Sequence, residues 1–400
     1  MKNDIWDLLI EESLNKTSTP FYLFSTSAIE DQLNKIHQIC DFPVYSCLSI
    51  KTLPLKELLK WWKTKELFAE VTSEYELIAA LTEGFTPHNI VVNGVAKHSW
   101  SENVWTDGLR VNFDSCTEIR ELSDMALKKK WHVGIRFHPR VQNDPETPSF
   151  PDQFGISSND FKIAVEWLIL KGIKLENVHI HLRSNIPNFE TFISAVDELY
   201  ENLKLLNLNI KSIDIGGGLP SANIKQKDLS WSSVFNLRDV SCLVNYIKNK
   251  FTDIVEIFFE YGRFVLSSCG IIVFTVIDIK NMNGVNFIIC DGGRVNNALP
   301  SDWEVHKIEV YPKRVGKLIE FNLCGSTCMA YDCFSRTNLP ENIQIGDKII
   351  YFDAGAYHLS WESHFSHPLS NILWHNHEEN SLSLVRKKES FEEWWSNSGL

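Results

Sequence analysis

The chain of 400 residues is long enough for two domains, and its 44% hydrophobic and 22% charged residues are typical of a globular protein. Its net charge of −12, with Lys and Arg scattered along the chain, argues against nucleic acid as the main partner, because phosphate binding needs a concentrated basic surface. No stretch approaches the roughly 18 apolar residues of a membrane span, and the start of the chain lacks a secretory signal pattern. The nine cysteines are dispersed without a CxxC pair, so we expect a cytoplasmic protein without a metal site.

Short apolar runs alternate with amphipathic segments through the first two thirds of the chain. The runs predict eight strands, at residues 44–50, 67–71, 89–92, 109–113, 132–137, 177–182, 212–215 and 254–259. Apolar residues near helical spacing lie between them at 73–84, 116–130, 158–171 and 189–205. This alternation predicts an α/β fold, a parallel (β/α)8 barrel over residues 27–265.

After about Val265 the sequence changes to β-rich segments separated by loops, at residues 270–280, 285–291, 317–323 and 348–353. They predict a C-terminal, mostly antiparallel β domain of the sandwich or barrel type over residues 266–400. The apolar run Phe21–Phe24 precedes the barrel, and we expect residues 1–26 to join this β domain. We interpret the aromatic tail at 391–395 as packing or interface.

Chemically reactive or polar residues interrupt the apolar pattern where the predicted barrel strands end, which is the face that carries sites in this architecture. They end or follow the first, sixth, seventh and eighth strands: Lys51, His181, Ser184, Gly216, Gly217, Gly218, Glu260 and Arg263. We therefore expect them to form one ring around the barrel mouth.

Lys51 ends a buried strand, where burial favours the neutral, nucleophilic amine that Schiff-base formation requires. The alternative is a lysine that extends into solvent at the barrel rim. The glycines at 216–218 let backbone amides approach a phosphate, and Arg263 is a suitable partner for its charge, although a plain tight turn is also possible.

The Glu260 carboxylate can hold a proton on the pyridine nitrogen of a bound ring, which makes that ring accept electrons. The alternative role for Glu260 is a salt bridge to Arg263. In the strand-like run His179-Ile180-His181 the two histidines share a face, so the sequence does not decide which one acts. Cys324 and Cys333 are given no role, because buried free cysteines are usually inert.

Further motifs follow in order along the chain. They include Ser49-Ile50-Lys51-Thr52, Ala69-Glu70-Val71-Thr72-Ser73-Glu74, Asn93-Gly94-Val95-Ala96-Lys97 and Gln153-Phe154-Gly155-Ile156. From about Thr19 to about Trp374 the sequence resembles the pyridoxal-phosphate (PLP) dependent decarboxylases of the alanine-racemase-like barrel class, which includes diaminopimelate and ornithine decarboxylases.

The resemblance implies pyridoxal 5'-phosphate as cofactor, with Lys51 as the Schiff-base lysine, His181 stacked on the ring and Glu260 at the pyridine nitrogen. It also implies a homodimer with shared sites, in which Cys328 reaches the partner's active site and takes part in catalysis. The implied phosphate cradle consists of Ser184, Gly216, Gly217, Gly218, Gly262, Arg263 and Tyr357.

Departures from the family pattern bear on the substrate. Met329 stands where diaminopimelate decarboxylases carry Glu, and their substrate-binding Arg-Pro segment is absent around Ala298-Leu299-Pro300, which disfavours diaminopimelate. The Asp beside the Cys of ornithine decarboxylases is also missing. The segments after Cys328 and Gly355 resemble most a branch from antibiotic and siderophore pathways, which suggests a modified, carrier-linked or nucleotide-linked amino acid.

Arg183 replaces a family glycine, so we expect its guanidinium to meet an anionic group of the substrate, or else to form a salt bridge on the rim. Three further residues are weaker candidates for substrate contact: Arg136, Tyr331 and Asp332. Two other functions compete with decarboxylation. Racemases of this class place Arg at the pyridine nitrogen, so Glu260 disfavours racemisation, and retention of Lys51 disfavours an inert regulatory homologue.

Overall fold

The computed structural model describes residues 2–38, 42–140, 153–186, 188–226 and 237–397. The chain divides into two compact units. The barrel unit consists of Leu33–Ala222 and Ser233–Phe264, and the β-rich unit of Met1–Gln32, Asn223–Ser232 and Val265–Leu400.

Eight parallel strands of the barrel unit form a closed ring, because the last strand pairs with the first. In ring order they are β2 (Val44–Ser49), β3 (Phe68–Val71), β4 (Ile90–Val92), β5 (Arg110–Phe113), β6 (His132–His138), β8 (Asn177–His179), β9 (Ser212–Asp214) and β11 (Glu256–Tyr261). The short β7 (Ile156–Ser157) adds to β6. All eight predicted strands are confirmed. Two details differ: β8 ends at His179, before His181, and Glu260 lies within β11 rather than after it.

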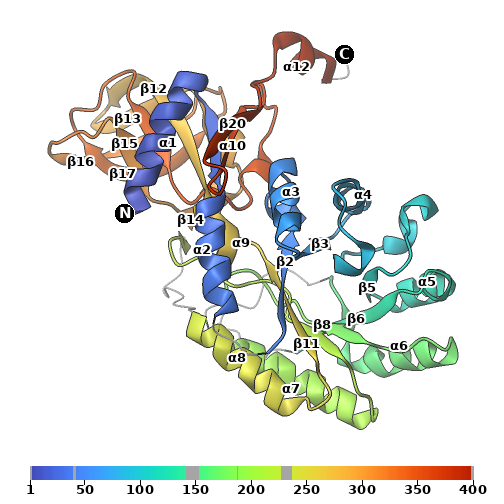
Figure 1. The fold of residues 1–400 in the computed structure, drawn as a ribbon. Helices are drawn as coiled ribbons and strands as arrows, with labels where there is room; N and C mark the ends of the chain where they lie inside the picture. Colours follow the sequence, from blue (N-terminus) through green and yellow to red (C-terminus); the bar gives the residue numbers. More distant parts are fainter. Residues whose placement is uncertain (1, 39–41, 141–152, 187, 227–236, 398–400) are drawn as a thin grey trace. The chain divides into compact units, whose positions relative to one another are not determined.

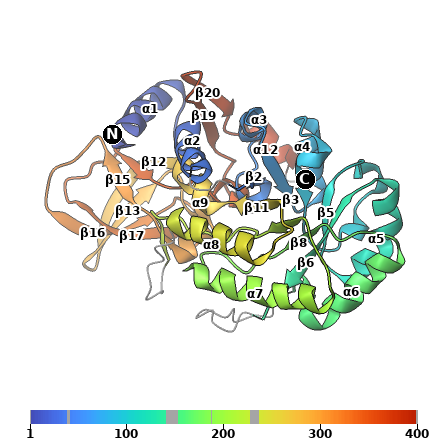
Figure 2. The same ribbon diagram turned by 60° about the horizontal axis from the view of Figure 1, so that its bottom comes forward.

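Helices follow the strands and lie on the outside of the ring, as Figures 1 and 2 show for α5 to α8. They are α3 (Lys56–Thr64), α4 (Glu74–Thr82), α5 (Cys116–Lys128), α6 (Ser158–Leu170), α7 (Phe189–Leu205) and α8 (Leu237–Lys250), with the short turns η1 (Ile50–Thr52), η2 (Pro87–Asn89), η3 (Lys97–Ser99) and η4 (Glu102–Val104). Four begin at a side chain that accepts a hydrogen bond from a first-turn amide, which satisfies an otherwise unpaired donor. These caps are Ser73, Ser115, Ser157 and Asn188.

The barrel interior is filled by side chains rather than open. Phe68 and Phe258 pack there with Cys47 and Val91. Tyr45 stacks on Phe258 with ring centroids 5.3 Å apart. This apolar layer is a packed core of the kind expected for a barrel of eight strands, and polar side chains are concentrated elsewhere along the strands.

The β-rich unit is built on a mostly antiparallel sheet in the order β17-β16-β13-β12-β1-β19-β20, with β18 paired to β12 and β15 to β18. Its strands are β1 (Phe21–Ser25), β12 (Gly270–Met282), β13 (Val285–Cys290), β15 (Ile308–Tyr311), β16 (Leu318–Cys324), β17 (Cys333–Pro340), β18 (Lys348–Tyr351), β19 (Asn371–Asn376) and β20 (Ser381–Arg386). A separate pair joins β10 (Lys225–Gln226) to β14 (Glu304–Val305). The expectation that Phe21–Phe24 joins this sheet is confirmed, since β1 pairs with β12 and β19.

The remaining helices are short except the first two. They are α1 (Lys2–Lys16), α2 (Thr26–His37), α9 (Arg263–Leu266), α10 (Arg294–Asn297), α11 (Pro300–Trp303) and α12 (Phe391–Asn397), with η5 (Ser267–Cys269) and η6 (Leu359–Trp361). Leu9 and Ile10 of α1 pack against Phe21, Leu23 and Ile271 of the sheet. Among the helices that the structure describes, none is long and apolar enough to cross a membrane.

Candidate active site

Lys51 lies in η1, directly after β2, at the carboxyl end of the barrel strands. Its Nζ donates to Oε2 of Glu70 at 2.7 Å. The Glu70 side chain is 1% exposed, whereas that of Lys51 is 39% exposed. The Lys51 amine is therefore not buried as the sequence predicted. The structure instead places it in an ion pair with a buried carboxylate, on the face where ligands bind in such barrels.

A chain of amide side chains connects the carboxylates of the site. Asn93, directly after β4, donates through Nδ2 to Oε1 of Glu70 at 3.2 Å and, by a short hydrogen bond, to Oε1 of Glu260. Asn112 donates to Oδ1 of Asn93 at 2.9 Å, and Asn177 donates to Oδ1 of Asn112 at 2.8 Å. Because each amide is fixed by the next, this chain holds Glu70 and Glu260 in place.

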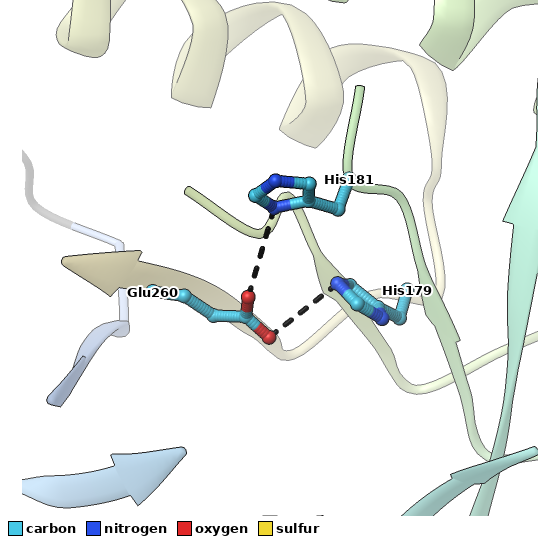
Figure 3. A group of neighbouring side chains, drawn as sticks. All are labelled: His179, His181 and Glu260. Carbon is cyan, nitrogen blue, oxygen red and sulfur yellow. Dashed lines mark ion pairs between the residues drawn. The ribbon is translucent and has the colours of Figure 1, made fainter. Parts of the chain in front are cut away.

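Two histidines approach Glu260, as Figure 3 shows. Nε2 of His179 lies 3.4 Å from Oε1 of Glu260, and Nδ1 of His181 lies 3.9 Å from Oε2. His179 and Glu260 are buried, while the His181 side chain is 29% exposed. The sequence left open which histidine acts, and the structure brings both to the same carboxylate.

The protonation states around Glu260 follow from burial and hydrogen bonds. The backbone amide of Gly217 donates to Nδ1 of His181 at 3.1 Å, so Nδ1 is an acceptor and a neutral His181 carries its proton on Nε2. Burial, reinforced by the charge of Arg136, lowers the pKa of His181 to about 3, and burial also lowers the pKa of His179. Burial acts to raise the pKa of Glu260, but the interaction with His179 outweighs it, and the pKa lies below its ordinary value.

A third buried carboxyl, Asp214, lies at the end of β9. Its Oδ1 accepts a hydrogen bond from the amide of Gly216 at 2.8 Å. Burial, together with the negative charge of Glu260, raises the pKa of Asp214 well above its ordinary value. The two neighbouring carboxyls therefore have pKa values shifted in opposite directions, with that of Asp214 raised and that of Glu260 lowered.

The glycine segment after β9 passes closely against its neighbours. Gly216 and Gly218 have φ of 67° and 94°, in the left-handed region that favours glycine. A Cβ on Gly217 would lie 2.7 Å from the backbone oxygen of Glu260, and one on Gly218 would lie 2.3 Å from that of Arg183. The segment thus requires glycine. Since the amides of Gly216 and Gly217 donate within the barrel, the phosphate role of the segment stays a prediction.

The other residues of the predicted phosphate cradle lie in both units. Arg263 is half-buried and begins α9 right after β11 and Gly262, and Ser184 is exposed in the loop after β8. Tyr357 belongs to the β-rich unit and has φ of 66°, a conformation that bulky residues rarely adopt and that is often found at ligand-binding positions.

Cys328 is exposed on a loop of the β-rich unit between β16 and β17. Asp332 is buried in the same loop, where its Oδ1 accepts from the amide of Arg294 at 2.8 Å. Oδ2 of Asp332 accepts from the amide of Thr327 at 3.1 Å and from its hydroxyl. Asp332 therefore holds the loop that carries Cys328, and its predicted contact with substrate stays a prediction.

The remaining substrate candidates are engaged within their own units. Nη1 of Arg136 lies 3.6 Å from Oδ1 of Asp114. Nη1 of Arg183 donates to the carbonyl of Ser184 at 3.0 Å. Tyr331 is exposed. Its ring lies 4.3 Å from the Arg294 guanidinium and its hydroxyl donates to Oδ1 of Asp302 at 3.2 Å, and its contact with substrate stays a prediction.

The barrel unit presents the donor set that PLP requires. It offers an amine at a strand end, an ionised carboxylate able to hold a pyridinium proton, an imidazole beside it and a turn into which no Cβ fits. Sequence reasoning missed the roles of Glu70, Asn93 and Asp214. The available signal was polar residues within or directly after apolar strands, such as Ile213-Asp214-Ile215.

Residues 26–267, more than half of the chain, match the family model described as "Pyridoxal-dependent decarboxylase, pyridoxal binding domain". The diaminopimelate decarboxylase of Aquifex aeolicus is 27% identical over 403 residues, covering 96% of this chain and 92% of that protein. That of Bacteroides thetaiotaomicron is 27% identical over 355 residues, covering 85% and 90%.

Solved structures share the whole architecture. Diaminopimelate decarboxylase from Helicobacter pylori, complexed with L-lysine, has a TM-score of 0.84 at 23% identity, covering 98% of this chain and 100% of that one. The arginine decarboxylase of Paramecium bursaria Chlorella virus has a TM-score of 0.77 at 18% identity, covering 94% and 100%. These likenesses establish the fold. With the family match, they show that the chain belongs to the pyridoxal-dependent decarboxylases, carboxy-lyases that use pyridoxal 5'-phosphate.

Proposed function

We propose that this decarboxylase holds its cofactor on Lys51 and acts on a modified or conjugated amino acid. The observation that carries the cofactor assignment is the contact of Lys51 with Glu70, in the network that also fixes Glu260. PLP accepts the electron pair that remains when CO2 leaves. Glu260, ionised and held by Asn93, would keep the proton on the ring nitrogen, and His181 would lie against the ring.

The substrate proposal rests on residues that differ from those of diaminopimelate decarboxylases. Met329 cannot supply the charged contact that Glu would give to the distal end of diaminopimelate, and the segment Ala298-Leu299-Pro300 contains no Arg. The relatives reported above nevertheless carry that enzyme's name. The proposed substrate is a modified, carrier-linked or nucleotide-linked amino acid of an antibiotic or siderophore pathway. Diaminopimelate is therefore the reference substrate with which it must be compared.

CO2 release by the purified protein tests this proposal. The panel contains meso-diaminopimelate, lysine, ornithine, arginine and glutamate, each free and as an acylated or carrier-linked derivative. We expect a conjugated compound to give the highest kcat/KM. A kcat/KM for free diaminopimelate within the usual enzymatic range of about 10⁴–10⁸ M⁻¹s⁻¹, above that of every conjugate, would contradict the substrate proposal.

Arg183 is the proposed contact for an anionic group of the substrate. Its guanidinium is anchored on the carbonyls of Ser184 and Asn185, at 3.0 and 3.4 Å, in the loop after β8. Losing one charge-assisted contact typically costs about 1.5–3 kcal/mol, so Arg183→Gly should lower kcat/KM about tenfold or more without loss of PLP. Full kcat/KM in this variant would show that Arg183 only supports its loop.

We also propose a homodimer with shared sites, in a cytoplasmic setting. The loop that presents Cys328 is fixed by Asp332, and the thiol is exposed. Such a placement suits a group that acts in a partner subunit, where the thiol or a water that it orients would return a proton to the substrate carbon.

A further inference from the structure

A second cluster of metal-ligand side chains lies in the β-rich unit. Glu304 is in β14, His306 follows it, and His358 precedes η6. All three residues are buried, and their possible ligand atoms lie within 4.8 Å of one another. Among the described residues, the other such cluster is the one formed by His179, His181 and Glu260 in the barrel. The cluster in the β-rich unit has no part in the function proposed above.

Both imidazoles of this cluster are oriented by backbone carbonyls. Nδ1 of His306 lies 2.8 Å from the carbonyl oxygen of Phe352, and Nδ1 of His358 lies 3.0 Å from that of Ala356. Because a carbonyl only accepts, each Nδ1 carries a proton and donates it. Nε2 is then the ring nitrogen that would bind an ion, and this is the second-shell arrangement found around most metal-bound histidines.

The distances agree with one ion shared by the three side chains. Nε2 of His306 lies 3.0 Å from Oε2 of Glu304. The rings of His306 and His358 have centroids 5.0 Å apart and planes at 89°. With Zn–N bonds of about 2.0–2.1 Å in a tetrahedral site, ligand atoms lie about 3.4 Å apart and two imidazole centroids about 5 Å apart.

The hydrogen bonds of the cluster show where an ion would replace a proton. Nδ1 of His306 donates to a carbonyl and its Nε2 faces the Glu304 carboxylate, so without an ion a single proton lies between Nε2 and Oε2. A divalent cation replaces that proton and meets the carboxylate and the Nε2 atoms directly. The surroundings are closed: the Tyr351 ring stacks on His306 at 4.6 Å, and the side chains of His306 and Glu304 are 0% and 1% exposed.

We propose that Glu304, His306 and His358 bind a zinc ion, with the fourth position taken by water. Two imidazoles and one carboxylate are zinc ligands, and soft thiolate ligands are not needed. The ion would connect β14 to the segment that follows β18. Because Tyr357 directly precedes His358, it would also fix the backbone that carries Tyr357.

Metal content tests this site. Protein is produced as holoenzyme in zinc-supplemented medium, and zinc and other first-row metals are measured by mass spectrometry. We expect about one zinc per chain, with N and O ligands at about 2.0–2.1 Å in X-ray absorption. His358→Gln and Glu304→Gln should lose the ion. The matched control is His364→Gln, in the same unit, whose exposed imidazole pairs with Glu389 at 2.9 Å and which should retain the ion.

Three outcomes would overturn the proposal. One is wild-type holoenzyme without a bound metal, which would leave a buried His306–Glu304 pair. Another is zinc with sulfur at about 2.3 Å, which would assign it to cysteines. The third is zinc that persists in the folded His358→Gln variant and disappears in His179→Gln, which would place it in the barrel. If the variants of the cluster fail to fold, two measurements still test the site. They are the X-ray absorption spectrum of the wild type and the zinc content of the His179→Gln variant.

Discussion

The buried ion pair between Lys97 and Glu118 provides the sharpest test of the packing around the loop that follows β4. Their Nζ and Oε2 atoms are 2.7 Å apart, and both side chains are 0% exposed. Breaking a buried pair by removing one partner costs about 3–5 kcal/mol, because the other charge remains buried. After Lys97→Met, Glu118 keeps hydrogen bonds at 2.8 Å from the amides of residues 97 and 114, so we expect a loss near 3 kcal/mol.

The reverse variant is expected to be worse. In Glu118→Gln the Lys97 ammonium keeps its hydrogen bond to the carbonyl of Gly94 at 2.8 Å but loses the carboxylate. The free energy of unfolding should then fall by up to about 5 kcal/mol. The double variant should cost less than the sum of the two, by roughly 0.5–3 kcal/mol. The assay is urea unfolding followed by circular dichroism. The control is Lys171→Met, whose pair with Asp124 is exposed and should contribute at most about 1 kcal/mol.

The reasoning fails if Lys97→Met unfolds at the same urea concentration as Lys171→Met. The same variants have a functional readout, because the loop of Lys97 also carries Asn93, which holds Glu70 and Glu260. Lys97→Met should therefore bind PLP more weakly than Lys171→Met does. Equal PLP affinity would mean that the buried pair does not support the site.

Three other predictions concern the site itself. Mixing inactive Lys51→Ala with inactive Cys328→Ala should restore activity in about a quarter of sites if subunits exchange and share sites, and no recovery despite exchange would place both residues in one chain. Glu260→Gln should lower kcat about 100-fold or more while PLP stays bound, as absorbance will show, and an unchanged kcat would remove Glu260 from the mechanism. Folding lowers the pKa values of His179 and His181, so the unfolded chain binds more protons than the folded one below pH 6.5. The free energy of unfolding should therefore fall below that pH, by up to about 1.4 kcal/mol per pH unit for each histidine. His181→Asn should flatten this decline between pH 6.5 and 5 in urea titrations, and an identical slope would contradict the assignment.

The barrel could be predicted because its strands are rich in apolar residues and four of its helices begin at a side chain that caps them. The predicted helix 189–205 has the bounds of α7, which Asn188 caps. Helix α1 was missed because its apolar residues are interspersed with acidic ones. It packs on strands that are distant in sequence, and a local pattern does not reveal such contacts. The excess length of the sixth predicted strand has a similar cause: Ile180 continues the apolar pattern, but its amide bonds to Asp214 outside regular strand pairing.

The sequence pointed to several residues that the structure brings together in the barrel, but not to the side chains that hold them. Lys51, His181 and Glu260 carry recognisable chemistry at strand ends. The contacts of Asn93 and Asp214 depend on which strands are neighbours in the closed ring. A single polar residue in an apolar run does not reveal the order of the strands. The cluster of Glu304 and His358 was missed for the same reason, because its members are far apart in sequence.

The most direct test of the central assignment is the position of the covalent bond to the cofactor. Holoenzyme is treated with borohydride, which fixes pyridoxal phosphate to the lysine that holds it, and the labelled peptide is sequenced by mass spectrometry. The label is expected on Lys51, which contacts Glu70 and is 39% exposed. A label on Lys97, which is fully buried against Glu118, or on any other lysine would contradict the assignment.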